Sequence, residues 1–187
     1  MEEDGIEQRI REYLVLLLLG TSKSSVHTIV QIQKEFFYLW NSSDRIRSLI
    51  RFIPHYRGPF SEALNDSIKK PMYLQDIWEY VPPHERDILS GGQVRLTEKG
   101  KRMFNEYMRK IKSSNKMELI ELIAAMRLLH DLYDDLTPEE LLYFVYVNPE
   151  NRDFIKRSQV YDMVMRDEIK YGIRKKIEPY FLEPGER

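Results

Sequence analysis

The sequence predicts a mainly α-helical protein with a small β-hairpin, organised as a winged-helix core and a C-terminal helical extension. The first observation behind this prediction is the order of patterns from Pro54 to Met108, where a short helix, a hairpin and a second helix follow one another. The second is apolar spacing typical of helices over most of the remaining chain. The third is a polar break at 113–115, which separates a predicted domain at 1–112 from a helical segment at 116–182.

The composition is that of a globular protein. Of the 187 residues, 42% are hydrophobic and 32% are charged, which argues against disorder. The chain has no cysteine, so disulfides and thiolate metal sites are excluded, and a cytoplasmic location is expected. The longest aliphatic run, Leu14 to Leu19, is far shorter than the roughly 20 residues that span a membrane, so we expect no membrane contact.

Two helices are predicted before residue 42. The first should run from Glu2 to Leu19 with Ile6 and Ile10 on its apolar face, and Gly20 should end it. The serine-rich turn that follows offers caps for a second helix from about Val26 to Trp40, whose aromatic residues predict the centre of the core.

The central segment carries the winged-helix pattern. A short helix is expected through Ile46 and Ile50, and the prolines and glycine between 52 and 60 exclude a helix there. Ser61 should cap a helix from Glu62 to Lys70. Alternation then predicts two strands, Asp76–Val81 and Gln93–Leu96, joined by a long polar tip.

The last predicted elements are helical. Thr97 should cap a helix from Glu98 to Lys112, and a further helix begins at Lys116. Thr137, Pro138 and Glu140 form the pattern of a capping box, with proline at the first helical position. Two final helices are expected at about Glu150–Arg157 and Ser158–Tyr180.

Charge is distributed unevenly along the chain. Residues 43–112 hold fourteen lysines and arginines against nine acidic residues, whereas residues 1–42 have a net charge of −2 and residues 113–187 a net charge of −4. The basic excess lies on the predicted winged-helix segment, as expected for a surface that faces phosphates. A solvated face of mixed charge is the alternative interpretation.

We find no pattern typical of an enzyme. Glycine-rich phosphate loops and nucleophile elbows are absent, and His27, His55, His84 and His130 lack the spacing of metal ligands. His130 and Asp134 share a helix face, but this arrangement is more often a solvated helix end than a metal site. The prediction is therefore no catalytic activity, no cofactor and no metal.

Recognition of duplex DNA is the function that the sequence favours, through a transcription regulator whose second helix enters the major groove. Glu62 and Asp66 would repel phosphate, so a protein–protein interaction module, with partner or self-association surfaces on the C-terminal helices, is the alternative. The side chains expected at bases and phosphates are Ser61, Asn65, Lys69, Lys70, Arg86, Arg95, Lys99, Lys101 and Arg102.

Three segments carry a family resemblance: HTIVQIQKEFFYL, HYRGPFSEALNDSI and VRLTEKGKRMF. Their order resembles the Panacea (SocA-like) antitoxin domains and their YwgA-like relatives in bacteria and archaea, over roughly Val26 to Ser158. The later LTPEELLYFVYVNPENRDFIKRS is similar to their C-terminal helical part, although Asn148-Pro149 stands where a tyrosine-proline pair is expected. The resemblance implies a winged-helix-like regulator or antitoxin-like adaptor.

Overall fold

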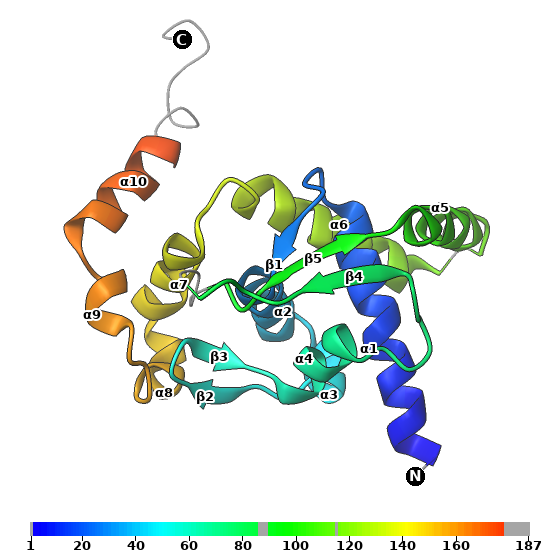
Figure 1. Cartoon of the computed structure of the whole chain (residues 1–187), viewed down its shortest axis with the longest axis horizontal. Coiled ribbons are helices and arrows are strands. Elements are labelled where there is room, and N and C mark those ends of the chain that lie inside the picture. The colour runs from blue at the N-terminus through cyan, green and yellow to red at the C-terminus, as the bar shows by residue number, and fades with distance from the viewer. Residues whose placement is uncertain (1, 86–89, 115, 178–187) are drawn as a thin grey trace, which may run out of the picture. The chain divides into compact units, whose positions relative to one another are not determined.

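The computed structural model describes residues 2–85, 90–114 and 116–177, which form a mainly helical protein with two small antiparallel sheets (Figure 1). These residues group into two compact units. The first comprises the chain up to Phe52 together with 61–134, and the second comprises 53–60 together with the chain from Asp135. Within the described residues, no helix is long and apolar enough to cross a membrane.

The first unit combines helices with a three-stranded sheet of order β1-β5-β4. His27 pairs with Val94, and Trp78 pairs with Leu96, so β5 is the central strand. The elements of this unit are α1 (Glu2–Thr21), β1 (His27–Thr28), α2 (Ile29–Ser42), α3 (Asp44–Leu49), α4 (Glu62–Lys69), β4 (Trp78–Val81), β5 (Gln93–Leu96), α5 (Glu98–Ser113) and α6 (Met117–Tyr133).

The division into units does not follow the polar break at 113–115. That break does separate two helices, but α6 packs against α1, α2 and α5. The second unit begins after Asp134 and also includes the short segment 53–60.

Helix α1 begins at Glu2 as predicted, but the apolar face of its first turns and its last residue differ from the prediction. The run from Leu14 to Leu19 is buried as expected, but Ile6 is 61% exposed and Ile10 also faces solvent. The predicted stop at Gly20 is wrong, because the helix continues to Thr21. Gly20 is needed for packing: a Cβ there would lie 2.3 Å from the Phe104 ring, which covers this turn.

A buried carboxylate on α1 organises the loop after α4. Glu12 is fully buried and accepts hydrogen bonds from the backbone N–H groups of Met72, Tyr73 and Leu74, at 2.7, 2.8 and 2.7 Å. Gln8 donates a further bond to the same carboxylate. Four donors satisfy this buried charge, and the loop is thereby fixed against the helix.

The strand β1 was not predicted. The chain at His27 and Thr28 pairs with β5 instead of beginning a helix at Val26, and Thr28 caps α2 by accepting the N–H of Gln31. The predicted aromatic centre of the core is confirmed, since Phe36 and Phe37 on α2 are fully buried.

The elements from α3 to α5 follow the sequence closely. The caps Ser61 and Thr97 and the strand Gln93–Leu96 are confirmed, and of the two possible caps for α3, Ser43 and Asp44, the structure has Ser43. The other strand begins at Trp78 instead of Asp76, because Asp76 has a φ of 63° and this left-handed conformation interrupts extended backbone.

The second unit is helical with one short hairpin. A helix across 52–60 is absent as predicted, but the hairpin there was not predicted. The predicted helix Ser158–Tyr180 is wrong in its described part, because two shorter helices replace it; residues 178–180 lie outside the described residues. The elements are β2 (Ile53–His55), β3 (Gly58–Phe60), α7 (Pro138–Val147), η1 (Pro149–Asn151), α8 (Arg152–Ile155), α9 (Tyr161–Val164) and α10 (Asp167–Ile177).

Specific hydrogen bonds explain the shape of this unit. The predicted capping box is confirmed, with Thr137 and Glu140 bonded reciprocally. Ser158 bonds to the hydroxyl of Tyr146 at 2.6 Å and accepts the N–H of Val160, so it forms a turn and not the start of a long helix. Lys176 on α10 pairs with Glu140 at 2.6 Å, which attaches α10 to α7.

Gly100 on α5 allows a test of how closely this helix packs against the backbone of Ile77. A Cβ at Gly100 would lie 2.0 Å from the carbonyl oxygen of Ile77, and this backbone contact cannot be relieved by a side-chain rotation. We expect Gly100→Ala to lower the free energy of unfolding by about 2 kcal/mol, even though alanine favours helices by about 1 kcal/mol over glycine.

Chemical denaturation measures this effect, and Asn105→Ala is the matched control because it places alanine at an exposed position of the same helix. Equal stability of the wild type and Gly100→Ala would contradict the close approach of α5 to Ile77.

Candidate functional site

The exposed face of α5 is the most basic surface of any element in the first unit. The helix holds six lysines and arginines against two glutamates. Arg102, Arg109 and Lys112 are exposed and lie at i, i+7 and i+10, which places them on one side of the helix. No carboxylate of the described residues forms an ion pair with these three side chains. Their charge is available to an anionic partner.

Three other predicted phosphate contacts are paired within the protein. Arg95 meets Glu79 across the hairpin at 2.7 Å, Lys99 lies 3.7 Å from Asp76, and Lys101 lies 2.7 Å from Glu98. The hydrogen bond and charge of Lys101 lower the pKa of the Glu98 carboxyl group. All three pairs are exposed, so each is weak in water and can exchange for a phosphate contact.

Helix α4 is a poorer candidate than its sequence suggested. The outward placement of Ser61 is wrong: this residue is fully buried, its hydroxyl caps α4, and its backbone exchanges two hydrogen bonds with Gln33 at 2.9 and 3.0 Å. It cannot meet a base without unfolding the helix start.

The remaining candidates on α4 are mixed in charge. Lys69 and Lys70 are exposed and Asn65 is half-buried, but Glu62 and Asp66 are exposed beside them. The ammonium of Lys69 lies 5.2 Å from the centre of the Tyr80 ring. Arg86, the candidate at the tip of the hairpin, lies outside the described residues.

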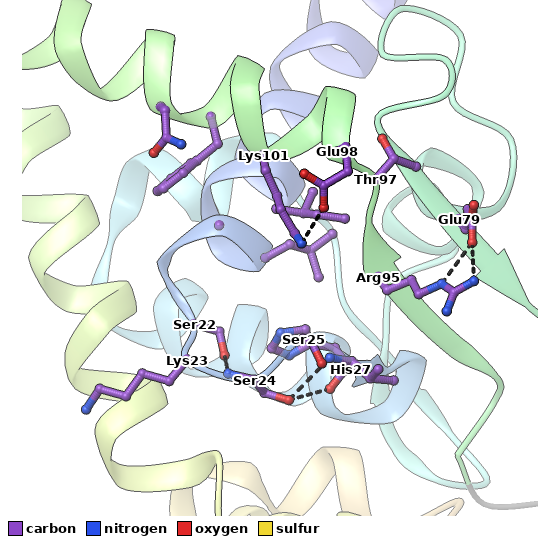
Figure 2. Close-up of a pocket in the computed structure, with 16 residues that line it drawn as sticks. Ser22, Lys23, Ser24, Ser25, His27, Glu79, Arg95, Thr97, Glu98 and Lys101 are labelled. Carbon is purple, nitrogen blue, oxygen red and sulfur yellow. Dashed lines mark hydrogen bonds and ion pairs between the residues drawn. The ribbon is translucent and has the colours of Figure 1, made fainter.

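A polar hollow of about 760 Å³ borders the hairpin, between the turn at 22–26, β5 and the first turns of α5 (Figure 2). Figure 2 shows the Arg95–Glu79 and Lys101–Glu98 pairs beside it. Two of its three serine hydroxyls are also engaged, since Ser22 donates to Asp134 at 2.7 Å and Ser24 donates to the carbonyl of Val26. Glu79 and Glu98 offset the positive charges of Arg95 and Lys101 at this hollow.

Comparison with protein-family models found no family that matches the sequence, and a search of curated proteins found no match. The resemblance to the Panacea and YwgA-like domains therefore rests on its sequence motifs and stays a prediction.

Proposed function

We propose that the first unit is a winged-helix DNA-binding module that contacts duplex phosphates through the exposed face of α5. The observation that carries this proposal is the combination of element order with an unpaired basic helix face. Arg102, Arg109 and Lys112 define this face, which we call the α5 basic face.

The order of the elements supports the winged-helix interpretation. The first unit begins with α1, β1, α2 and α3. After the inserted segment 53–60, it continues with α4 and the β4–β5 hairpin. The first strand pairs with the second strand of the hairpin, which gives the sheet order β1-β5-β4. In a winged helix, α4 would occupy the position of the recognition helix and the hairpin would form the wing.

The charges favour phosphate contacts over base reading. Glu62 and Asp66 offset Lys69 and Lys70 on α4, so this helix gains little from approaching a duplex. The offset on α5 is smaller, because one exposed glutamate, Glu106, lies between Arg102 and Arg109 on a face of three basic side chains. Arginine is also well suited to phosphate oxygens. The proposal is therefore binding with weak sequence preference and a strong dependence on salt concentration.

The test is a triple charge reversal, Arg102→Glu, Arg109→Glu and Lys112→Glu, assayed by fluorescence anisotropy with a duplex of random sequence. We expect the triple variant to lose binding at low salt, because each neutralised phosphate contributes about 0.9 to the slope of log K against log salt. Single Arg102→Glu and Arg109→Glu variants should each reduce the slope by about 1.

A matched control keeps the same total charge change. Arg152, Arg157 and Arg174 are exposed in the second unit, and reversing all three changes the net charge equally. The proposal would be contradicted if this control lost DNA binding while the α5 triple variant kept it. It would also be contradicted if the wild type did not bind DNA at low salt.

A second candidate function is a protein–protein interaction module, and an apolar face on α6 favours it. Ile120, Ala124, Leu128 and Leu132 are exposed and recur every four residues, and Leu128 and Leu132 are 63% and 64% exposed. An apolar hollow of about 520 Å³ lies beside the same helix, lined partly by Leu122. Exposed apolar side chains that recur on one helix face are typical of contact sites.

Self-association is the simplest form of this second candidate. In sedimentation equilibrium over a range of concentrations, the wild type should form dimers, and Leu128→Lys with Leu132→Lys should weaken dimerisation at least tenfold. Met72→Lys is the control, because Met72 is equally exposed but lies away from α6 in the loop after α4. A wild type that stays monomeric throughout the range would contradict self-association.

A further inference from the structure

Four ionisable side chains from three elements of the first unit meet in its interior. They are His27 on β1, Glu35 on α2, and His130 and Asp134 at the end of α6. His27, Glu35 and His130 are only 2%, 0% and 3% exposed. One ligand atom each of His27, Glu35 and Asp134 lie within 4.8 Å of one another. We call these four residues the His–carboxylate cluster.

Several polar atoms of the cluster are buried without a partner. Among the described residues, three of its atoms have no hydrogen-bond partner of normal geometry. They are the two ring nitrogens of His27 and the Oε2 atom of Glu35. A buried polar atom without a hydrogen-bond partner lowers the stability of the folded state. Several such atoms at one place therefore need an explanation.

The orientation of His130 gives an independent indication. Its Nε2 atom lies 2.8 Å from the carbonyl oxygen of Leu18 and must therefore carry a proton to donate. Its Nδ1 atom then faces two carboxylates, at 3.1 Å from Asp134 and 3.4 Å from Glu35. A lone pair directed at two carboxylates is repulsive, so a proton or a metal ion must lie between them.

A proton on His130 satisfies only part of the cluster. That proton would lie between Asp134 and Glu35, at 3.1 and 3.4 Å from their nearest carboxylate oxygens. It would leave the ring nitrogens of His27 and the Oε2 atom of Glu35 without a hydrogen-bond partner of normal geometry.

We propose that the His–carboxylate cluster binds one divalent first-row transition-metal ion. Two neutral imidazoles and two carboxylates supply four ligands, and their two negative charges balance the ion. The Nε2–H group of His130, bonded to a backbone carbonyl, provides the outer contact that orients metal-bound histidines. Nitrogen and oxygen ligands of a tetrahedral ion lie roughly 3.3–3.6 Å from one another. The atoms of His27, Glu35 and Asp134, which lie within 4.8 Å, would therefore have to close by up to about 1.5 Å around the ion.

The donor set restricts the kind of ion. Mg²⁺ and Ca²⁺ prefer oxygen ligands alone, and the two imidazoles exclude a site dedicated to either. Nitrogen and oxygen donors without thiolates suit Zn²⁺, Co²⁺, Ni²⁺, Mn²⁺ or Fe²⁺. Burial of the ligands indicates a structural ion, one that would join β1 and α2 to the end of α6.

The hollow of Figure 2 offers a route for the ion, because His27 on β1 lines it next to the turn at 22–26. Ser22 holds this turn over the cluster through its bond to Asp134, and Lys23 pairs with Asp131 on α6 at 2.6 Å. Opening the turn would release both contacts and expose the cluster without unfolding a helix.

The first test uses the full chain, freed of metal by a chelator and then titrated with Zn²⁺ or Co²⁺ in the absence of DNA. Calorimetry should give one equivalent of bound metal, and the unfolding temperature should rise with metal concentration above the dissociation constant. Glu35→Gln and Asp134→Asn keep the shape of each side chain and should weaken binding by more than the 10- to 100-fold that an outer-shell change typically costs.

His84→Asn is the matched control, because His84 is exposed in the hairpin loop and its loss should leave the affinity unchanged. X-ray absorption of the wild-type zinc complex should show two imidazole ligands, and this measurement does not depend on whether a variant folds. Absence of binding for all these ions, an affinity unaffected by Glu35→Gln, or a spectrum without imidazole would overturn the proposal.

Discussion

Burial of α2 is the constraint on which the first unit depends. Three consecutive polar side chains of this helix, Gln33, Lys34 and Glu35, are buried together with its aromatic residues. Because buried polar groups require partners, each neighbouring element must present the right atoms to α2. Gln33 meets the backbone of Ser61 with both ends of its amide, which sets where α4 begins. Glu35 meets His130, which sets how the end of α6 approaches.

Glu12 imposes the same kind of constraint from α1. Its carboxylate needs the three N–H groups of the loop at 72–74, so that loop cannot move without leaving a buried charge unsatisfied. Two residues after this loop, Asp76 has a left-handed backbone conformation. Its carbonyl accepts a hydrogen bond from the hydroxyl of Thr97 at 2.7 Å. The loop after α4, the hairpin and the start of α5 are therefore positioned by hydrogen bonds as much as by apolar packing.

Local signals were sufficient to predict most of the elements. A cap at Ser43, Ser61, Thr97 or Thr137 depends on a hydrogen bond three residues away, so a short stretch of sequence contains the whole interaction. The strand β1 could not be predicted in this way. Its two residues are extended because β5, more than sixty residues later, pairs with them. Gly20 looked like a helix stop because nothing nearby in sequence reveals the Phe104 ring.

The candidate sites show the same limit. The basic excess on α5 is visible in the sequence, but the pairing of Arg95 with Glu79 is visible only in the sheet. His130 and Asp134 were correctly placed on one helix face. Their isolation in sequence favoured a solvated helix end, because neither Glu35 nor the carbonyl of Leu18 could be assigned to them from spacing. Contacts separated by about a hundred residues depend on packing that no local pattern specifies.

The two proposals concern different parts of the first unit and can fail separately. The α5 basic face is exposed and acts through charge, so its effect falls with salt concentration. The His–carboxylate cluster is buried and would act through coordination, which salt screens far less. The elements are nonetheless connected: His27 pairs with Val94 on β5, and β5 leads through Thr97 into α5. An ion held by His27 would thus fix the sheet from which the α5 basic face extends, so metal removal should loosen that face without altering its charges.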